Sequence, residues 1–176
     1  MAGGREIPDD IRWQMAARIL TRLPAAYDTA FRPVLRQQYD ELEQEIWMEL
    51  AGAAYATARD LALPTRTAKD LAGTISTIHS IFFGPEFACE ALEVAPDRAV
   101  IIVKRCPFPA DAMEAGGGGV GDDCPVFRRC MAFTLTAVPL LNRDFTARFV
   151  RTLCTGDRQC EIKIELKPVE EPKKKR

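Results

Sequence analysis

The sequence predicts an α+β fold in which N-terminal helices pack on an antiparallel sheet of about four strands. Through residue 84, apolar side chains recur with a period near 3.6, which is typical of amphipathic helices. After Gly84 the period changes to 2, and two pairs of short alternating segments predict two hairpins separated by helical sequence. The length of 176 residues and the apolar content of 47% suit one globular domain.

We assign this single domain to residues 1–167, with a helical part at 1–64, a cysteine-rich part at 65–167 and a charged, flexible tail at 168–176. The net charge of −1 argues against a nucleic-acid partner, because phosphate binding depends on clustered basic charge. The longest uncharged run considered, residues 71–85, is too short for a membrane span. No apolar leader is seen at the N-terminus, so we expect a cytoplasmic protein without membrane contact.

Three helices are predicted before Gly84. The first ends at Pro24, and its apolar stripe consists of Ile11, Met15, Ile19 and Leu23. The second runs from near Pro33 to about Asp60, and its stripe consists of Leu35, Tyr39, Leu42, Ile46 and Leu50. The third begins at Thr67 and Asp70, a pair resembling a capping box. Because the first two stripes exceed what a small sheet can cover, we predict a homodimer through the N-terminal helices.

Two hairpins and one helix are predicted after Gly84. The first hairpin spans residues 87–103, and the second begins at Phe145 and turns at residues 155–157. Its last strand alternates apolar with charged residues, which indicates one wet face and hence an antiparallel sheet. Between the hairpins, a helix is predicted to begin at Asp122 or Asp123 and to run to about Leu141.

Six cysteines are many for a chain without an export signal, and in a reducing compartment they favour thiol chemistry or metal binding over structural disulfides. One interpretation is a zinc or iron–sulfur site, whose candidate ligands are Cys106, Cys124, Cys130, Cys154 and Cys160. Another is catalysis by Cys124 or Cys106, with Asp123 or Asp157 as the base. A helix N-terminus lowers the pKa of a thiol, which favours Cys124.

A third interpretation of the cysteines is simple packing as small buried hydrophobes. It fits Cys89 and Cys160 best, because both lie on apolar strand faces, and we expect Cys89 to be buried, inert and apart from the others. His79 is the only histidine, and it lies on a mostly apolar helix. We expect it to be a partly buried residue with a hydrogen-bonded ring.

The cysteine-rich part resembles a known family. The resemblance depends on three groups of residues: Arg105-Cys106-Pro107, then Cys124 and Cys130 on a helix, then Gly156-Asp157 followed by Cys160. Over roughly residues 65–167, this pattern resembles the L-2-amino-thiazoline-4-carboxylic acid hydrolase-like family and is more distantly similar to 4-vinyl reductase domains. The first resemblance implies ring opening of a small cyclic C–N or sulfur-containing metabolite.

The second resemblance implies a small-molecule or tetrapyrrole-binding module. Some such domains hold zinc with a helix cysteine, an acidic residue and two cysteines around the last hairpin turn. Cys124 or Cys130 matches the helix ligand here, and Cys160 matches the cysteine after the turn. Cys154 lies closer to the turn than its counterpart, and the acidic position holds no Asp or Glu, although Cys106 could replace it.

Three functions therefore follow from the sequence, and the first two imply a small-molecule ligand. The first is a hydrolase-like enzyme acting on a small cyclic substrate. The second is a non-catalytic binding or sensor module with a cysteine-ligated metal. The third is a helical dimerisation or interaction protein.

Overall fold

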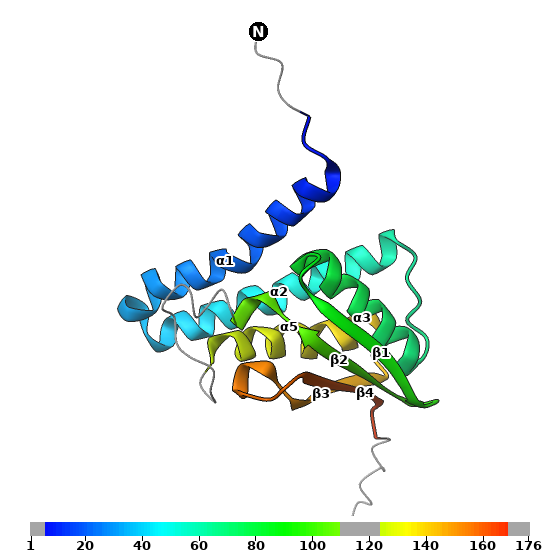
Figure 1. The fold of residues 1–176 in the computed structure, drawn as a ribbon. Coiled ribbons are helices and arrows are strands. Elements are labelled where there is room, and N and C mark those ends of the chain that lie inside the picture. The colour runs from blue at the N-terminus through cyan, green and yellow to red at the C-terminus, as the bar shows by residue number, and fades with distance from the viewer. Residues whose placement is uncertain (1–5, 110–123, 169–176) are drawn as a thin grey trace, which may run out of the picture.

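The computed structural model describes residues 6–109 and 124–168. Its helices are α1 (Asp9–Leu35), α2 (Gln37–Asp60), α3 (Ala68–Phe83) and α5 (Pro125–Leu141), with a short 3₁₀ helix η1 (Leu153–Thr155). Its strands are β1 (Ala88–Ala95), β2 (Arg98–Arg105), β3 (Phe145–Arg151) and β4 (Cys160–Leu166). They form one antiparallel sheet in the order β1-β2-β4-β3 (Figure 1). The predicted α+β class with N-terminal helices is confirmed.

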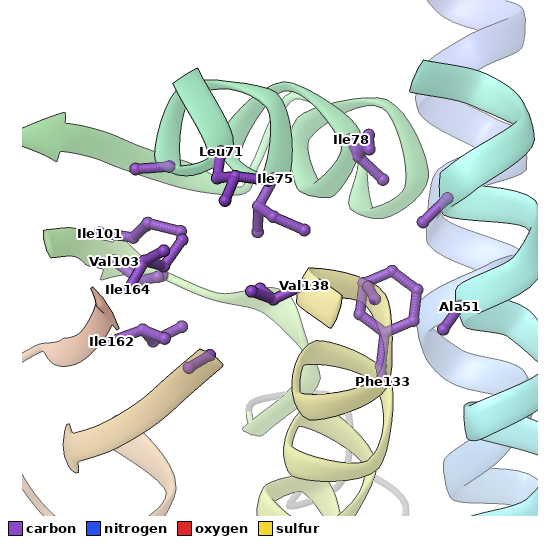
Figure 2. Packing of buried hydrophobic residues seen from close by; sticks show 14 of the residues in the cluster. Ala51, Leu71, Ile75, Ile78, Ile101, Val103, Phe133, Val138, Ile162 and Ile164 are labelled. Carbon is purple, nitrogen blue, oxygen red and sulfur yellow. The ribbon is translucent and has the colours of Figure 1, made fainter. Parts of the chain in front are cut away.

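The main core lies between the sheet and the helices α3 and α5. In Figure 2, α3 directs Leu71 and Ile75 toward the inner face of the sheet, and Ile78 lies nearer to Phe133 of α5. Ile101 of β2 and Ile164 of β4 face them, and both are fully buried. Apolar residues at helical spacing on α3 thus meet apolar residues at period 2 on the strands, so burial of one shared surface stabilises both elements.

The two predicted hairpins are joined through β4, which lies between β2 and β3. In the register, Ile162 is opposite Ile101 on one side and Phe149 on the other. A strand with two neighbours has its backbone amides and carbonyls paired on both edges, which leaves the outer strands β1 and β3 as the sheet edges. The cysteine at the start of β4 is thereby held at a fixed place in the sheet.

The third helix begins as predicted. The Thr67 hydroxyl oxygen accepts a hydrogen bond from the Asp70 amide at 3.1 Å, and the Asp70 carboxylate accepts one from the Thr67 amide at 3.0 Å. The helix ends at Gly84, whose φ of 83° lies in the left-handed region that favours glycine. A Cβ at Gly84 would overlap the Cβ of Ala17, so α1 passes close to the end of α3.

The prediction that Pro24 ends the first helix is wrong. The helix α1 continues through Pro24 and Pro33 to Leu35, and α2 begins after Arg36, which has a φ of 50°. An internal proline removes one helical hydrogen bond, so a helix keeps it only when other contacts hold the following residues. Here the segment after Pro24 is fixed by Arg32, which forms ion pairs with Asp40 and Glu43 of α2, and by Asp28, which pairs with Arg129 of α5.

The buried faces of α1 and α2 also differ from the predicted stripes. Ile19 is 65% exposed and Ile46 is 64% exposed, and all four predicted stripe residues of α1 are exposed. Tyr39 of the predicted α2 stripe is buried, and the other buried residues of α2 lie outside that stripe: Glu43, Trp47, Ala51, Ala54 and Ala58. Small alanine side chains let the backbones of α2 and α5 approach closely, which explains why this face packs inward and the larger residues face outward.

Candidate ligand-binding cavity

A cavity of about 30 Å³ lies where α2, α3, α5 and the sheet meet. Its wall is almost entirely apolar and is dominated by aromatic rings from different elements: Trp47, Phe83, Phe87, Phe108, Phe133 and Phe149. Several of these rings pack edge to face, including Phe83 against Phe108, with centroids 4.8 Å apart. Such a wall suits a small apolar or aromatic guest.

His79 places a polar group in this aromatic wall. The helix α3 directs it among Phe83, Phe87 and Phe133, whose ring centroids lie 5.3, 5.4 and 5.6 Å from its own. The side chain is 4% exposed, and within residues 6–109 and 124–168 its Nδ1 has no hydrogen-bond partner. Burial lowers the pKa of His79 to about 4, so the ring is neutral near pH 7.

This environment differs from the one expected for His79. The residue is buried on an apolar helix, but its Nδ1 lacks the hydrogen bond that a histidine with a purely structural role would normally make. The sequence pattern therefore did not indicate that this cavity-lining residue has a buried nitrogen without a partner. The available signal was that the only histidine of the chain lies on the inward face of α3, one residue after Ile78.

Four of the candidate cysteines line the same cavity. They come from the end of β2, from α5, from η1 and from the start of β4: Cys106, Cys130, Cys154 and Cys160. The sheet order brings these elements to one end of the molecule because β4 pairs with both β2 and β3. Cys89 is not among them, and its thiol donates to the Ser76 carbonyl oxygen at 3.7 Å. It is half-buried rather than fully buried, and burial raises its pKa.

The fifth candidate, Cys124, is buried and is the N-cap residue of α5. The hydrogen bond from the Cys154 thiol is the main influence that lowers the pKa of Cys124 to about 6. The backbone amides of Val126 and Phe127 also donate to this sulfur and stabilise its thiolate form. The same contact, together with burial, raises the pKa of Cys154 well above its usual range.

The remaining thiols have different surroundings. Burial raises the pKa of Cys130 to about 12 and also raises that of Cys160. The Cys160 sulfur accepts a hydrogen bond from the Leu153 amide at 3.3 Å. Among Cys89, Cys124, Cys130, Cys154 and Cys160, Cys124 is the one whose pKa is lowered.

The candidate carboxylates are less informative. Asp157 Oδ2 accepts a hydrogen bond from the Thr152 amide at 2.8 Å, so this side chain stabilises its own turn. Asp122 and Asp123 lie outside the described residues, and the N-cap position predicted for them is occupied by Cys124. Counting only the residues that the structure describes, no three His, Cys, Asp or Glu side chains are arranged to hold a metal ion.

A buried ion network adjoins the cavity. Arg129 of α5 is 2% exposed. Its Nε donates a hydrogen bond to the Glu43 carboxylate at 2.6 Å, and its guanidinium also forms an ion pair with Asp28. Arg32 of α1 pairs with the same two carboxylates. Burial raises the pKa of Glu43, and the guanidinium of Arg129 opposes that shift. This network joins α1, α2 and α5, and its signal in the sequence is that Glu43 stands four residues from both Tyr39 and Trp47 on the buried stripe.

Comparison with known proteins relates the fold to small-molecule-binding and trafficking proteins. No protein-family model matches the sequence, and no curated protein matches it significantly. The phenol-responsive sensory domain of the transcription activator PoxR, solved with phenol, superposes with a TM-score of 0.60 at 12% identity, over 83% of this chain and 74% of that one. A trafficking protein particle complex subunit 3 from Naegleria fowleri, covalently bound to palmitic acid, gives a TM-score of 0.50 at 15% identity, over 90% and 97%.

These likenesses establish a shared fold. The resemblance of the cysteine-rich part to hydrolase-like and 4-vinyl reductase families stays a hypothesis, because no family model supports either name. Within the described residues, none of the helices has the length and apolarity needed to cross a membrane.

Proposed function

We propose that this protein binds a small aromatic molecule carrying one hydroxyl or ring N–H group, and that it does not transform it. The supporting observation is the unpartnered Nδ1 of His79 in a cavity walled by aromatic rings. A buried polar atom without a partner costs about 1–3 kcal/mol, and a hydroxyl donating to Nδ1 would remove that cost. The neutral ring leaves one nitrogen free to accept such a bond.

The comparison with PoxR supports this ligand class, because the same fold was solved there with phenol. The cavity of about 30 Å³ is smaller than a benzene-sized site, for which about 150 Å³ suffices. Binding therefore requires the wall to open, and half-buried rings such as Phe127 and Phe149 are the ones with room to turn. A chain as long as palmitate, which the trafficking subunit carries, would need a far larger change.

A second candidate is the hydrolase-like activity implied by the family resemblance. The lowered pKa of Cys124 favours it, since a thiolate is the nucleophilic form. The described partners of that sulfur are another thiol and two backbone amides, and none of these is a general base for water. Asp157 is already engaged in its turn. Binding is therefore the better supported function.

The binding test compares phenol with toluene, which has the same ring but no hydroxyl. Titration calorimetry of the full chain should give phenol the higher affinity, by about tenfold if the hydrogen bond contributes about 1.4 kcal/mol. His79→Phe keeps a ring among Phe83, Phe87 and Phe133 but removes Nδ1. This variant should lose the preference for phenol while binding toluene as before. Trp13→Phe is the matched control, because it also replaces one ring by phenylalanine but at a residue that does not line the cavity.

Two further measurements sharpen this test. Phenol affinity should be constant between about pH 5 and 8 and should fall as the pH drops through about 4, because protonated His79 can no longer accept a hydrogen bond. Mass spectrometry of a cyclic aminothiazoline incubated with the protein checks the second candidate. Ring opening that disappears in Cys124→Ser would favour the enzyme, and equal affinities for phenol and toluene in the wild type would refute the proposed ligand class.

A further inference from the structure

We propose that the ligand of this cavity carries two hydrogen-bond donors, as a benzenediol does, and that the hydroxyl oxygen of Thr152 accepts the second of them. This inference rests on the function proposed above, in which His79 Nδ1 accepts the first donor. It adds a residue that determines specificity. It also narrows the ligand class from a phenol to an aromatic ring that bears two hydroxyl or N–H groups.

Thr152 belongs to the same cavity wall as His79 and is shielded from solvent. It directly follows β3, it is 5% exposed, and it lines the cavity. His79 comes from α3, so the two residues reach the cavity from different elements of the fold. In an apolar wall, a few polar groups decide which ligand is accepted, because a ligand donor that finds no acceptor there loses its hydration without replacement.

The backbone of Thr152 has no capacity left for a ligand. Its amide donates to Asp157 Oδ2 at 2.8 Å. Its carbonyl oxygen accepts hydrogen bonds from the Thr155 amide at 3.2 Å, from the Asp157 amide at 3.1 Å and from the Thr155 hydroxyl at 3.1 Å. A carbonyl oxygen has two lone pairs, so these three donors saturate it. The hydroxyl is therefore the polar group of Thr152 that remains for a ligand.

The hydrogen bonds of the turn make this hydroxyl an acceptor. Thr152 Oγ1 and Thr155 Oγ1 lie 2.8 Å apart, and each hydroxyl has one proton to donate. Because the Thr155 proton is donated to the Thr152 carbonyl oxygen, both bonds form only when the Thr152 hydroxyl donates to Thr155 Oγ1. The reverse arrangement leaves the Thr152 proton without an acceptor among the described residues. The Thr152 oxygen thus keeps its lone pairs for a donor, and its orientation is fixed.

The other polar side chains of the wall do not offer the same acceptor. Arg129 has only donors, and its guanidinium is already paired with two carboxylates. Thr134 lies inside α5, where a threonine hydroxyl can donate to the carbonyl oxygen of the preceding turn, and none of the described hydrogen bonds fixes it to another element. The thiols of the wall are weak acceptors. Two acceptors therefore face one ligand, and a ligand with two donors matches them.

The first part of the experiment varies the ligand. Titration calorimetry of the full chain, in a reductant that keeps the diols from oxidising, compares phenol with the three benzenediols and the three fluorophenols. One benzenediol should bind about tenfold more tightly than phenol, because it gains one further hydrogen bond. The fluorophenol with the same substitution pattern has no second donor and should bind no more tightly than phenol. The position of the preferred second hydroxyl then reports the spacing of the two acceptors.

The second part varies the protein. Thr152→Val keeps the shape of the side chain but removes the hydroxyl, so this variant should bind the preferred diol only as tightly as phenol. Its affinity for phenol should equal that of the wild type, which also shows that the variant is folded. Thr152→Ser retains a hydroxyl and should retain the preference for the diol. Thr134→Val, the same change at the other threonine of the cavity wall, is the matched control and should behave as the wild type.

Three results would overturn the inference. The first is equal affinity of the wild type for phenol and all three diols. The second is a fluorophenol that binds as tightly as the preferred diol, which would assign the gain to ring size or electronics rather than to a donated bond. The third is a preference for the diol that persists in Thr152→Val or disappears in Thr134→Val. The function proposed above fails on a different comparison, that of phenol with toluene, so the two failures are distinguishable.

Discussion

The helices α1 and α3 have similar apolar patterns in the sequence but opposite positions in the fold. In α3, the apolar residues Leu71, Ile75 and Ile78 are fully buried between the sheet and α5 (Figure 2). In α1, the buried positions are Ala17, Thr21, Ala25 and Asp28, and the large apolar side chains are exposed. Figure 1 shows α1 lying along the outside of the helical layer.

The difference shows that two kinds of force attach the helices. Burial of apolar surface holds α3, at roughly 25 cal/mol per Å² removed from water. The second half of α1 is held by Asp28 and Arg32, which reach the buried carboxylate of Glu43 and the guanidinium of Arg129. A charge network of this kind fixes the position of a helix while leaving its apolar side free for another partner.

The largest expected effect comes from breaking the network that attaches α1. Arg129→Met removes the buried cation of the network and leaves Asp28 and Glu43 with the partly exposed Arg32 alone, which should lower the free energy of unfolding by about 3–5 kcal/mol. Urea denaturation followed by circular dichroism measures this change. Arg18→Met is the matched control, because its ion pair with Glu86 is exposed and should contribute less than about 1 kcal/mol. Equal effects of the two substitutions would contradict the role given to the network.

The next effect compares two isoleucines, one on each helix. Ile75→Ala in α3 should destabilise the protein by about 2–5 kcal/mol, because it leaves a cavity in the core. Ile19→Ala in α1 should change the free energy of unfolding by less than about 0.5 kcal/mol, since this side chain is 65% exposed. The same urea series measures both. A large loss from Ile19→Ala would mean that its side chain is buried in solution.

Substitutions in the groove between α1 and α2 should have the smallest effect on the free energy of unfolding, but they should change the oligomeric state. Leu20, Phe31, Leu42 and Ile46 line this apolar groove of about 500 Å³. We expect a second copy of the chain to cover it, because exposed apolar patches of this kind mark interaction sites. Sedimentation at micromolar concentration should show a dimer.

The dimer prediction has its own variants. Ile46→Glu should give a folded monomer, because it places a charge in the apolar groove. Leu92→Glu is the matched control, since this residue is similarly exposed but lies on β1 at the sheet edge. A wild-type protein that sediments as a monomer at these concentrations would refute a dimer through the N-terminal helices.

Local sequence signals predicted those elements in which the signals agree with the packing. The capping box at Thr67, the apolar face of α3 and the strict alternation from Cys160 to Leu166 each predicted what the structure contains. In these segments the period of the apolar residues matches the surface that is buried, so pattern and tertiary structure give the same answer. The gathering of cysteines at the hairpin ends and on α5 was likewise visible as a hypothesis from the order of the elements.

Only the tertiary structure decided which face of α1 and α2 turns inward and which residues form the cavity. Pro24 remains inside α1 because Asp28 and Arg32 are held from other helices, and no local pattern records those contacts. His79 becomes a candidate recognition group only when Phe83, Phe87 and Phe133 surround it and leave Nδ1 without a partner. Cys130, Cys154 and Cys160 likewise come to line one cavity only when the sheet and α5 pack together, since contacts between distant segments depend on the packing of the whole chain.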